Sequence, residues 1–495
     1  MYIHAFFKEK HVCSMGKYPA LGAFLCALVC GVILIQCSDE NSTRDEPLYR
    51  DFYVLDATKQ YTDPDAWYTV HTKKLASTNS AIVYVDEAEA DVSVNDAQQL
   101  ASEFDAVISP KVTQYFARPL DVDRNGKIVL VVFDIKDNYA FTGAYMGGYF
   151  YPYDLFKRDT DNPHSNEGDI LYIDCNPQAV PADAKKTLAH EFQHLVNFSN
   201  AVRKYNATGA QAVCDTWIDE GLAEAAGHLC FGALTDRISY YNAASGIDQN
   251  PLFYWDAAGD VLNNYAKSYL FFQYMRAQST ADVSADAGWD IYKNILASDY
   301  GDWRAVAAAM QMDDMLSNSA WGSTDGERFN RLVLRWYAAS NIETAGIDAK
   351  YSYKGVLGSN PLVGHLYTFT TVNLKSGGGV VKTMNGAFSS PSVDFIYLSV
   401  SGSGSSDDFN SPFADLDYFV AVYGAYNVDM VITGNTSLPA SVAAIDPVSG
   451  ESVYDGRGGM RAAVDTAPQR IDMVFSRKLH DSPPIFDAGM SGGGN

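Results

Sequence analysis

Two histidines four residues apart, His190 and His194, have the spacing in this chain that most clearly indicates chemistry. Positions i and i+4 lie on one face of a helix, so the two imidazoles can bind a single metal ion. Glu191 follows the first histidine, and it can reach a water on that metal without being a ligand. A helix is predicted over 181–197, because Pro181 suits a first turn and the apolar residues recur at helical spacing. The motif therefore predicts a hydrolytic zinc site on a helix.

A catalytic zinc needs three protein ligands and one open position, so a third ligand must be found. A third histidine six residues after the second is excluded, because Asn200 occupies that place. Glu220 is the better candidate, since it lies on the next predicted helix, 217–230, and Glu224 follows one turn later on the same face. His228 lies one further turn along, and it either approaches the site or is a plain helical histidine. We therefore predict one zinc ion per chain, bound by the two histidines and Glu220.

The segments around these residues resemble two groups of zinc peptidases. Trp217-Ile-Asp-Glu-Gly-Leu-Ala-Glu224 is similar to the Trp-x-x-Glu-Gly-x-Ala segment of gluzincins such as aminopeptidase N. The closer likeness is to the hyicolysin family of bacterial metallopeptidases, over roughly residues 80–340. It is carried by the His190 motif with Asn197-Phe198, and by Phe104–Ile108, Asp121–Ile128, Asp169–Asp174 and Tyr269–Phe272.

The resemblance implies an α+β fold with a thermolysin-like catalytic unit, in which a small mixed sheet is followed by a helical lobe. It implies the same three zinc ligands and assigns Glu191 as general base and proton shuttle. Glu224 matches the acidic residue that orients the first histidine through its other ring nitrogen. A substrate peptide bond is the expected target of such a site.

The segment Asn264-Tyr-Ala-Lys-Ser268 is similar to the Tyr-x-Lys-Gly segment that carries an oxyanion-stabilising tyrosine. The resemblance thus implies Tyr265 in that role, with Tyr269 in reserve. The Gly-x-Met-Glu-Asn motif, whose Glu holds the substrate amine in aminopeptidases, is absent, and Gly143–Gly148 has no carboxylate. This favours an endopeptidase. An aminopeptidase, or a surface binding protein with a structural or degenerate zinc site, is the alternative.

Length and composition indicate a globular protein rather than a disordered one. The 495 residues predict two or three domains, and 47% hydrophobic residues can form sizeable cores. The net charge of −24 argues against nucleic acid as a partner. Strands are predicted at 81–85, 127–134 and 169–174, the last half exposed and able to pair with a substrate backbone. Further helices are predicted at 265–277, 288–297, 303–315 and 326–339.

The predicted domains follow from these patterns and from a change of character near residue 350. Beyond it, apolar runs alternate with Gly, Ser, Asn and Pro clusters, which is typical of a β-sandwich. We expect a signal peptide at 1–36, a tether at 37–55, a catalytic domain at 56–345 divided at 180/181 into β-containing and helical parts, a β-rich domain at 350–480, and a flexible tail at 481–495.

The N-terminus has the layout of a secretory signal, because three lysines precede an apolar run over 18–36. Leu34-Ile-Gln-Cys37 resembles a bacterial lipobox, with Gln36 in place of the usual small residue, so Cys37 is the candidate lipid attachment site. An uncleaved membrane anchor is the alternative, since the run is just long enough to span a bilayer. Both readings predict export to the cell envelope and protein or peptide substrates there.

Three cysteines, Cys175, Cys214 and Cys230, lie beyond this leader. Their number is odd, in a compartment where disulfides persist. A bridge between Cys214 and Cys230 and three free thiols are both open alternatives.

A possible calcium loop is suggested by Asp121, Asp123 and Asn125 followed by Gly126. Val132 stands where a bidentate Glu should close such a loop. An acid-rich turn is therefore the alternative to a bound calcium ion.

Overall fold

The structure is a computed structural model that describes residues 46–362, except 61, 211, 244–251, 253–254, 256–260, 282–285, 343–348, 350–351 and 360–361. Six strands between 370 and 471 are described in addition, by their backbone. The predicted signal peptide, Cys37 and the predicted tail lie outside the described residues. Within the described part of the chain, no helix combines the length and the apolar character that crossing a membrane requires.

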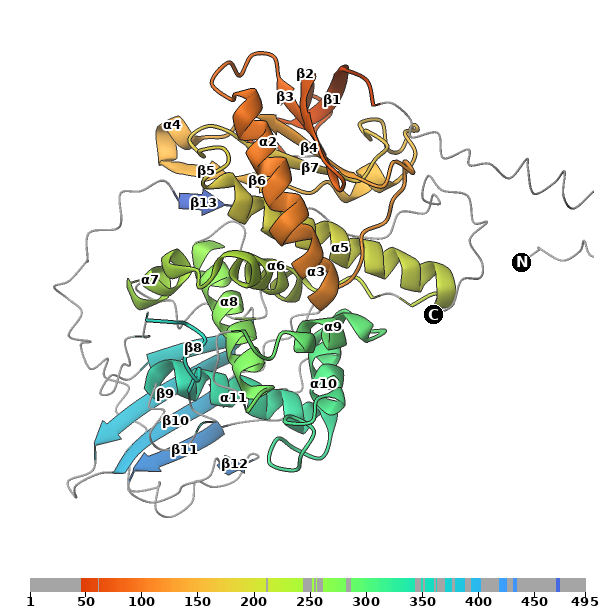
Figure 1. Cartoon of the computed structure of the whole chain (residues 1–495). Helices are drawn as coiled ribbons and strands as arrows, with labels where there is room; N and C mark the ends of the chain where they lie inside the picture. Colours follow the sequence, from red (N-terminus) through yellow and green to blue (C-terminus); the bar gives the residue numbers. More distant parts are fainter. Residues whose placement is uncertain are drawn as a thin grey trace, which may run out of the picture. The chain divides into compact units, whose positions relative to one another are not determined.

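The first half of the described chain forms a six-stranded mixed sheet (Figure 1). Its order is β1-β2-β3-β4-β7-β6, with β3, β4 and β7 parallel and the other pairs antiparallel. The bounds are β1 Tyr49–Leu55, β2 Trp67–Ser77, β3 Ala81–Asp86, β4 Ile128–Phe133, β6 Gly148–Tyr149 and β7 Ile170–Asp174. All six residues of β4 are buried, as expected of a strand whose two faces are both covered.

The strand β7 is not the half-exposed edge that the sequence predicted at 169–174. It lies between β4 and β6, and all five of its residues are buried. Leu171 and Ile173 pack into the core on the helical side, whereas Ile170 and Tyr172 pack into a second apolar cluster on the opposite face. The exposure was predicted wrongly because the alternation of residue types along 169–174 was interpreted as one buried and one exposed face. In the structure both faces of the strand are covered. The sheet ends instead at β6.

The folded body also begins earlier than predicted. β1 starts at Tyr49, inside the range 37–55 that we expected to be a tether, and it pairs along its whole length with β2. Phe52, Val54 and Leu55 are fully buried. The alternation of apolar residues in this segment is therefore that of a sheet strand.

The connection between β3 and β4 is a nearly continuous helix with an irregular turn in its middle. Ser93 begins α2 (Val94–Glu103) with a capping box to Asp96. A π-helical turn, Phe104–Ile108, follows, and α3 (Ser109–Tyr115) then contains Pro110 in its first turn. The turn accommodates the proline, which lacks an N–H for the regular helix ladder. The interruption predicted at Pro110 is thus a local change of helix type.

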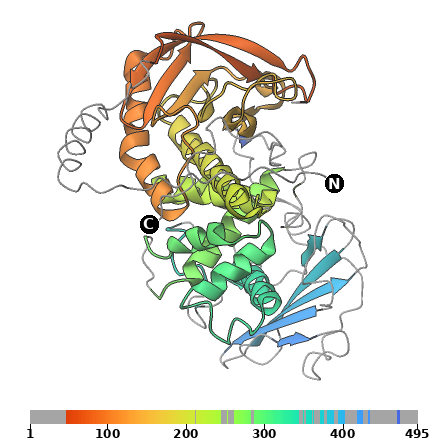
Figure 2. The same cartoon turned by 90° about the vertical axis from the view of Figure 1, so that its right-hand side faces the viewer.

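The helical lobe follows β7, and its first helix lies against the sheet (Figures 1 and 2). Its helices are α5 Ala184–Thr208, α6 Thr216–Phe231, α7 Thr235–Ala243, α8 Val261–Gln278, α9 Asp290–Ala297, α10 Trp303–Met312 and α11 Asp325–Ile342. α5 runs well past the predicted end at 197, until Gly209 ends it with a φ of 76°. α6 is buried on nearly every side, and Asp219, Glu220, Glu224 and His228 are buried together with its apolar residues.

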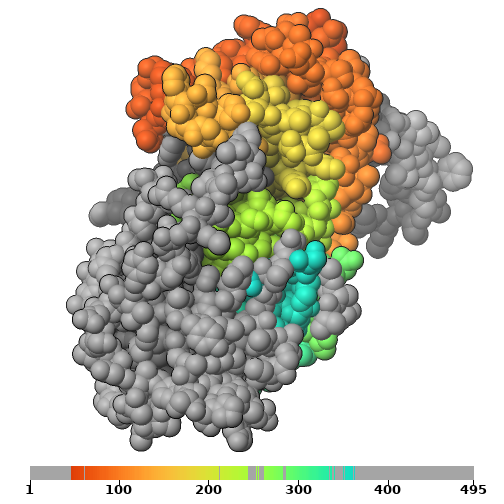
Figure 3. Space-filling view, turned by 90° about the vertical axis from the view of Figure 1, so that its left-hand side faces the viewer, coloured from red at the N-terminus to blue at the C-terminus, as the bar shows by residue number. Residues whose placement is uncertain are grey.

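One apolar cluster includes residues from the helical side of the sheet and from the helices α2, α3 and α5 to α11. In the space-filling view, the yellow and green residues of α5 and α6 lie directly beneath the orange residues of the sheet (Figure 3). The residues that follow α11 belong to this body as well. Tyr353 and Leu357 are buried, and Gln278 donates from Nε2 to the Ser352 carbonyl at 2.9 Å. The helical part therefore extends beyond the predicted boundary at 345.

The C-terminal part contains a five-stranded antiparallel sheet of order β12-β11-β10-β9-β8. Its strands are β8 Thr370–Lys375, β9 Gly379–Ala387, β10 Val393–Ser401, β11 Tyr418–Gly424 and β12 Val431–Thr433. This agrees with the predicted β-rich character, and the second layer of a sandwich stays a prediction. A further strand, β13 (Gln469–Ile471), pairs in parallel with β5 (Ala144–Met146).

Candidate metal centre

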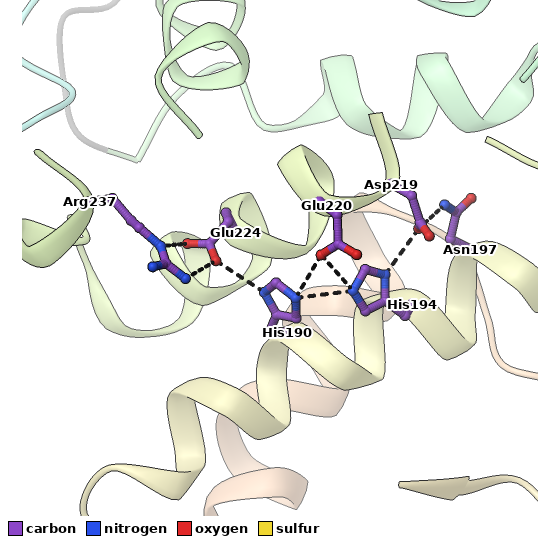
Figure 4. A network of polar contacts seen from close by, with 7 residues as sticks. All are labelled: His190, His194, Asn197, Asp219, Glu220, Glu224 and Arg237. Atoms are coloured by element: carbon purple, nitrogen blue, oxygen red, sulfur yellow. Dashed lines mark hydrogen bonds and ion pairs between the residues drawn. The ribbon is translucent and has the colours of Figure 1, made fainter. Parts of the chain in front are cut away.

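Three buried side chains from two neighbouring helices converge at one point (Figure 4). His190 and His194 project from α5, and their Nε2 atoms lie 3.0 Å apart. Glu220 on α6 places Oε2 3.2 Å from the Nε2 atom of each histidine. Each of the three residues is 1% exposed or less. The structure therefore brings together the three ligands that the sequence predicted.

The spacing of these atoms fits a tetrahedral metal ion. Zinc bonds of about 2.0 to 2.1 Å in tetrahedral geometry place ligand atoms roughly 3.3 Å apart. The three separations in the structure are 3.0, 3.2 and 3.2 Å, so a slight outward movement of the side chains would accommodate zinc.

A carboxylate lies on the far side of each imidazole. His190 has its Nδ1 3.4 Å from Oε1 of Glu224, and His194 has its Nδ1 3.1 Å from Oδ1 of Asp219. When a cation takes the Nε2 lone pairs, the proton of each neutral ring lies on Nδ1, where these carboxylates can accept it. Both Nε2 atoms also lie 3.2 Å from the Glu220 carboxylate, so the convergence suits either a shared proton or a metal ion.

The ionisation of Glu220 agrees with a ligand role. Burial alone would raise its pKa, but the charges and hydrogen bonds of His194 and His190 outweigh burial and lower the pKa to about 2. The carboxylate is therefore anionic in the pH range of interest.

Glu224, which the resemblance implies as the residue that orients His190, lies against the far side of that ring, and the structure adds a residue that sequence reasoning missed. Arg237 on α7 donates from Nε and Nη2 to the two carboxylate oxygens of Glu224, at 3.1 and 2.8 Å. Both residues are buried. No spacing rule links an arginine to a glutamate thirteen residues earlier, and α7 itself was not among the predicted helices. The signal that could have suggested a cationic partner was Glu224 itself, because a carboxylate on a helix that is expected to be buried needs a nearby cation.

Glu191 lies under the edge strand β6. A Cβ atom added at Gly148 would lie 3.4 Å from Cγ of Glu191 and only 2.7 Å from the Tyr172 carbonyl oxygen. Glycine therefore lets this strand pass close over the predicted base. Glu191 itself is 1% exposed.

Of the two candidate tyrosines, Tyr265 lies beside the site and Tyr269 does not. The ring centroid of Tyr265 is 6.2 Å from that of His190, and the Arg237 guanidinium lies over its ring at 4.7 Å. The Tyr269 hydroxyl accepts from the Leu234 amide at 3.1 Å and lies 2.8 Å from Nδ1 of His228. The reserve candidate is thus engaged elsewhere.

His228 belongs to that second network rather than to the metal ligands. Burial, followed by the charge of Arg276, lowers the pKa of His228 to about 3, so its ring is neutral. The Tyr269 hydroxyl accepts from the Leu234 amide and also forms a hydrogen bond with Nδ1 of this ring. The plain helical histidine is the alternative that the structure supports.

The acid-rich turn brings Asp121 and Asp123 close to the buried Asp169, with carboxylate oxygens within 4.8 Å of one another. These carboxylates accept hydrogen bonds from the turn itself. Asp121 accepts from the Gly126 amide, Asp123 from both nitrogens of Asn125, and Asp169 from the Val122 amide. These hydrogen bonds show that the aspartate side chains stabilise the turn.

The three cysteines of the described chain, Cys175, Cys214 and Cys230, are free thiols, so the bridge between Cys214 and Cys230 is not formed. Burial raises the pKa of Cys230 to about 12, which makes it unreactive.

Two histidines on α5 and a glutamate on α6 are the ligand types of a zinc metallopeptidase site, and comparison with a known protein agrees. The chain is 41% identical over 214 residues to the neutral metalloprotease ShpI of Staphylococcus hyicus. The match covers 41% of this chain and 46% of ShpI, so the chain matches about half the length of this relative. No family model matches the chain. The resemblance to the hyicolysin-like metallopeptidases is thereby confirmed.

Proposed function

We propose that the chain is a zinc-dependent endopeptidase that cleaves proteins or peptides outside the cytoplasm. The observation that carries the proposal is the convergence of His190, His194 and Glu220, together with the buried Glu191 directly after His190. The similarity to a protein named a neutral metalloprotease supports it.

The two histidines and Glu220 would hold the metal ion, and one coordination position would stay open. Bound zinc would supply a positive charge that polarises the scissile carbonyl and acidifies water. Glu191 accepts a proton from the attacking water and passes it to the leaving nitrogen. Tyr265 donates a hydrogen bond to the oxygen on which negative charge develops. The buried position of Tyr265 beside His190 supports this assignment.

The substrate would bind along the edge of the sheet that passes over Glu191. β6 pairs with β7 on one side, and an extended peptide adds to a sheet edge through its backbone. Gly143–Gly148, which leads into this strand, contains no carboxylate that could hold a free amino terminus. Cleavage within a chain is therefore favoured over removal of single N-terminal residues.

The location is proposed from the N-terminal sequence. Three lysines, an apolar run and Cys37 suit an exported chain that is held at the cell envelope by a lipid. The wild type should incorporate a labelled fatty acid, and replacing Cys37 by Ser should abolish the incorporation. No incorporation by the wild type would favour the uncleaved anchor instead.

The activity is tested with the purified full chain and an unfolded protein substrate. We expect cleavage that stops with a zinc chelator and returns on adding zinc. Peptides with blocked and free amino termini distinguish the two kinds of peptidase, since only an endopeptidase cleaves the blocked set. Zinc binding without cleavage of any peptide bond would contradict the proposal and favour a binding protein.

A further inference from the structure

The second histidine of the site has a polar support that no motif predicted. His194 has its Nδ1 3.1 Å from Oδ1 of Asp219, and Asn197 donates from Nδ2 to the same oxygen at 2.5 Å (Figure 4). All three side chains are at least 95% buried. The network is therefore shielded from competing water.

The positions of these residues in the helices couple the support to the metal site. Asp219 directly precedes the ligand Glu220 on α6. Asn197 follows His194 by three residues on α5, so the two side chains lie on neighbouring turns of one helix face. One turn of α6 thus supplies the predicted ligand Glu220 and the residue that contacts His194. One turn of α5 supplies His194 and the residue that contacts Asp219.

The donor and acceptor roles in this network follow from the chemistry of its groups. The amide nitrogen of Asn197 only donates, and its oxygen lies 3.5 Å from the Cys214 sulfur, whose thiol donates to it. Asp219 only accepts, so it receives from Asn197 and from the Nδ1–H of His194. Nε2, which faces Glu220, is then the ring nitrogen of His194 that is left to bind a metal ion.

We propose that Asp219 and Asn197 are positioning residues for the metal centre. Asp219 holds His194 in the Nδ1–H tautomer and in the orientation that a metal ion requires, and Asn197 holds the Asp219 carboxylate in place. This inference rests on the proposed function in that it assumes a zinc ion at the site. The pair does for the second histidine what Glu224 and Arg237 do for the first.

The test measures zinc affinity by competition with a chromogenic chelator, which does not depend on catalysis. We expect Asp219→Ala to weaken zinc binding by about 10- to 100-fold. Asp219→Asn keeps an acceptor of the same shape, so it should recover part of this loss. Asn197→Ala should show a smaller loss that nearly disappears in the double variant with Asp219→Ala, because Asn197 acts through Asp219.

A spectrum separates positioning from a general loss of structure. We expect the visible absorption of the cobalt(II)-loaded protein to change in Asp219→Asn, because the support of a ligand has changed. Asp154→Asn is the matched control, since Asp154 is a fully buried, hydrogen-bonded acid in the sheet part of the chain. It should leave both the zinc affinity and the cobalt spectrum as in the wild type.

The outcomes distinguish this inference from the proposed function. Wild-type zinc affinity and an unchanged cobalt spectrum in Asp219→Asn and Asn197→Ala would overturn the inference, even if the wild type cleaves peptides. Weakened zinc binding in both variants, with a wild type that cleaves nothing, would support the inference and contradict the proposed function. If Asp219→Ala fails to fold, the two milder variants still decide the question.

Discussion

Arg237 and Glu224 form a two-pronged ion pair, with Nε to Oε2 at 3.1 Å and Nη2 to Oε1 at 2.8 Å. The Arg237 side chain is 4% exposed and the Glu224 side chain is fully buried. The same Oε1 atom lies 3.4 Å from Nδ1 of His190. The ion pair therefore balances the buried charge of Glu224 and orients it towards the ring.

Replacing Arg237 by Met should destabilise the metal-free protein by about 3 to 5 kcal/mol, because the Glu224 carboxylate would remain buried without its cation. Urea unfolding in the presence of a chelator measures this. Arg304→Met is the control, since its partner Asp302 is paired at the surface and such pairs contribute up to about 1 kcal/mol. Equal losses in the two variants would contradict the interpretation.

Replacing Glu191 by Gln should keep zinc affinity close to wild type and lower kcat/KM for a peptide by at least about 100-fold. Glutamine has nearly the same shape but cannot accept a proton from water. Metal analysis of the preparation checks the retained zinc, and kinetics on the same preparation check the fall in kcat/KM. Full activity in this variant would refute the assignment of Glu191 as the base.

Removal of the metal should lower the thermal unfolding temperature. The ligand atoms of His190, His194 and Glu220 converge in the folded chain, so zinc binds the folded state in preference to the unfolded one. A free zinc concentration of 100 times Kd should stabilise the fold by about 2.7 kcal/mol. Calorimetry with chelator and with added zinc measures the shift, and His194→Ala should abolish it. An identical unfolding temperature in both conditions would count against a metal site.

Replacing Gly221 by Ala should destabilise the protein by about 1 to 3 kcal/mol. The new Cβ would lie 2.3 and 2.5 Å from ring atoms of Phe272 on α8, so α6 and its ligand Glu220 would have to move. Gly227→Ala in the same helix meets only Leu234, at 3.7 Å, and should stabilise by up to about 1 kcal/mol. Chemical unfolding and zinc affinity of the pair test this, and similar behaviour of both would contradict it.

The pH dependence of stability should carry a contribution from Asp154. Burial raises its pKa to about 7 from an ordinary 3.8, although hydrogen bonds from Asn166 and Tyr172 act against the rise. Between these values the unfolded chain has lost the proton and the folded chain keeps it. The free energy of unfolding should therefore fall as the pH rises from about 4 to 7, by on the order of 2 to 4 kcal/mol.

Urea unfolding at pH 5 and pH 7.5, with chelator present throughout, compares the wild type with Asp154→Asn. The variant has no titrating group at this position, so it should lose less stability between the two pH values. The same loss in both proteins would exclude Asp154 as the cause.

Much of the site could be predicted because its spacing is local. Residues i and i+4 of any helix lie on one face, so the pairing of His190 and His194 could be predicted from the sequence. Glu220 could be predicted because it lies in a recognisable motif on the next helix. Most of the helices were predicted for the same reason, since helical periodicity is visible along the chain. The strand β7 was placed correctly along the chain but not in its exposure, because exposure depends on what packs on each face.

The partners of the imidazoles could not be predicted in the same way. Asp219, Asn197 and Arg237 are ordinary polar residues in the sequence, and their roles depend on how α5, α6 and α7 are rotated against one another. Tyr265 lies within the motif that suggested it and Tyr269 directly follows that motif, and only the packing of α8 shows which ring lies beside His190.

The sequence by itself determined which side chains could bind a metal, because the rise and turn of a helix are the same in every protein. Only the tertiary structure decided which carboxylate faces which ring nitrogen, because that depends on the distance and rotation between packed helices. At Gly221, a single missing Cβ lets Phe272 approach α6 and so contributes to the position of Glu220.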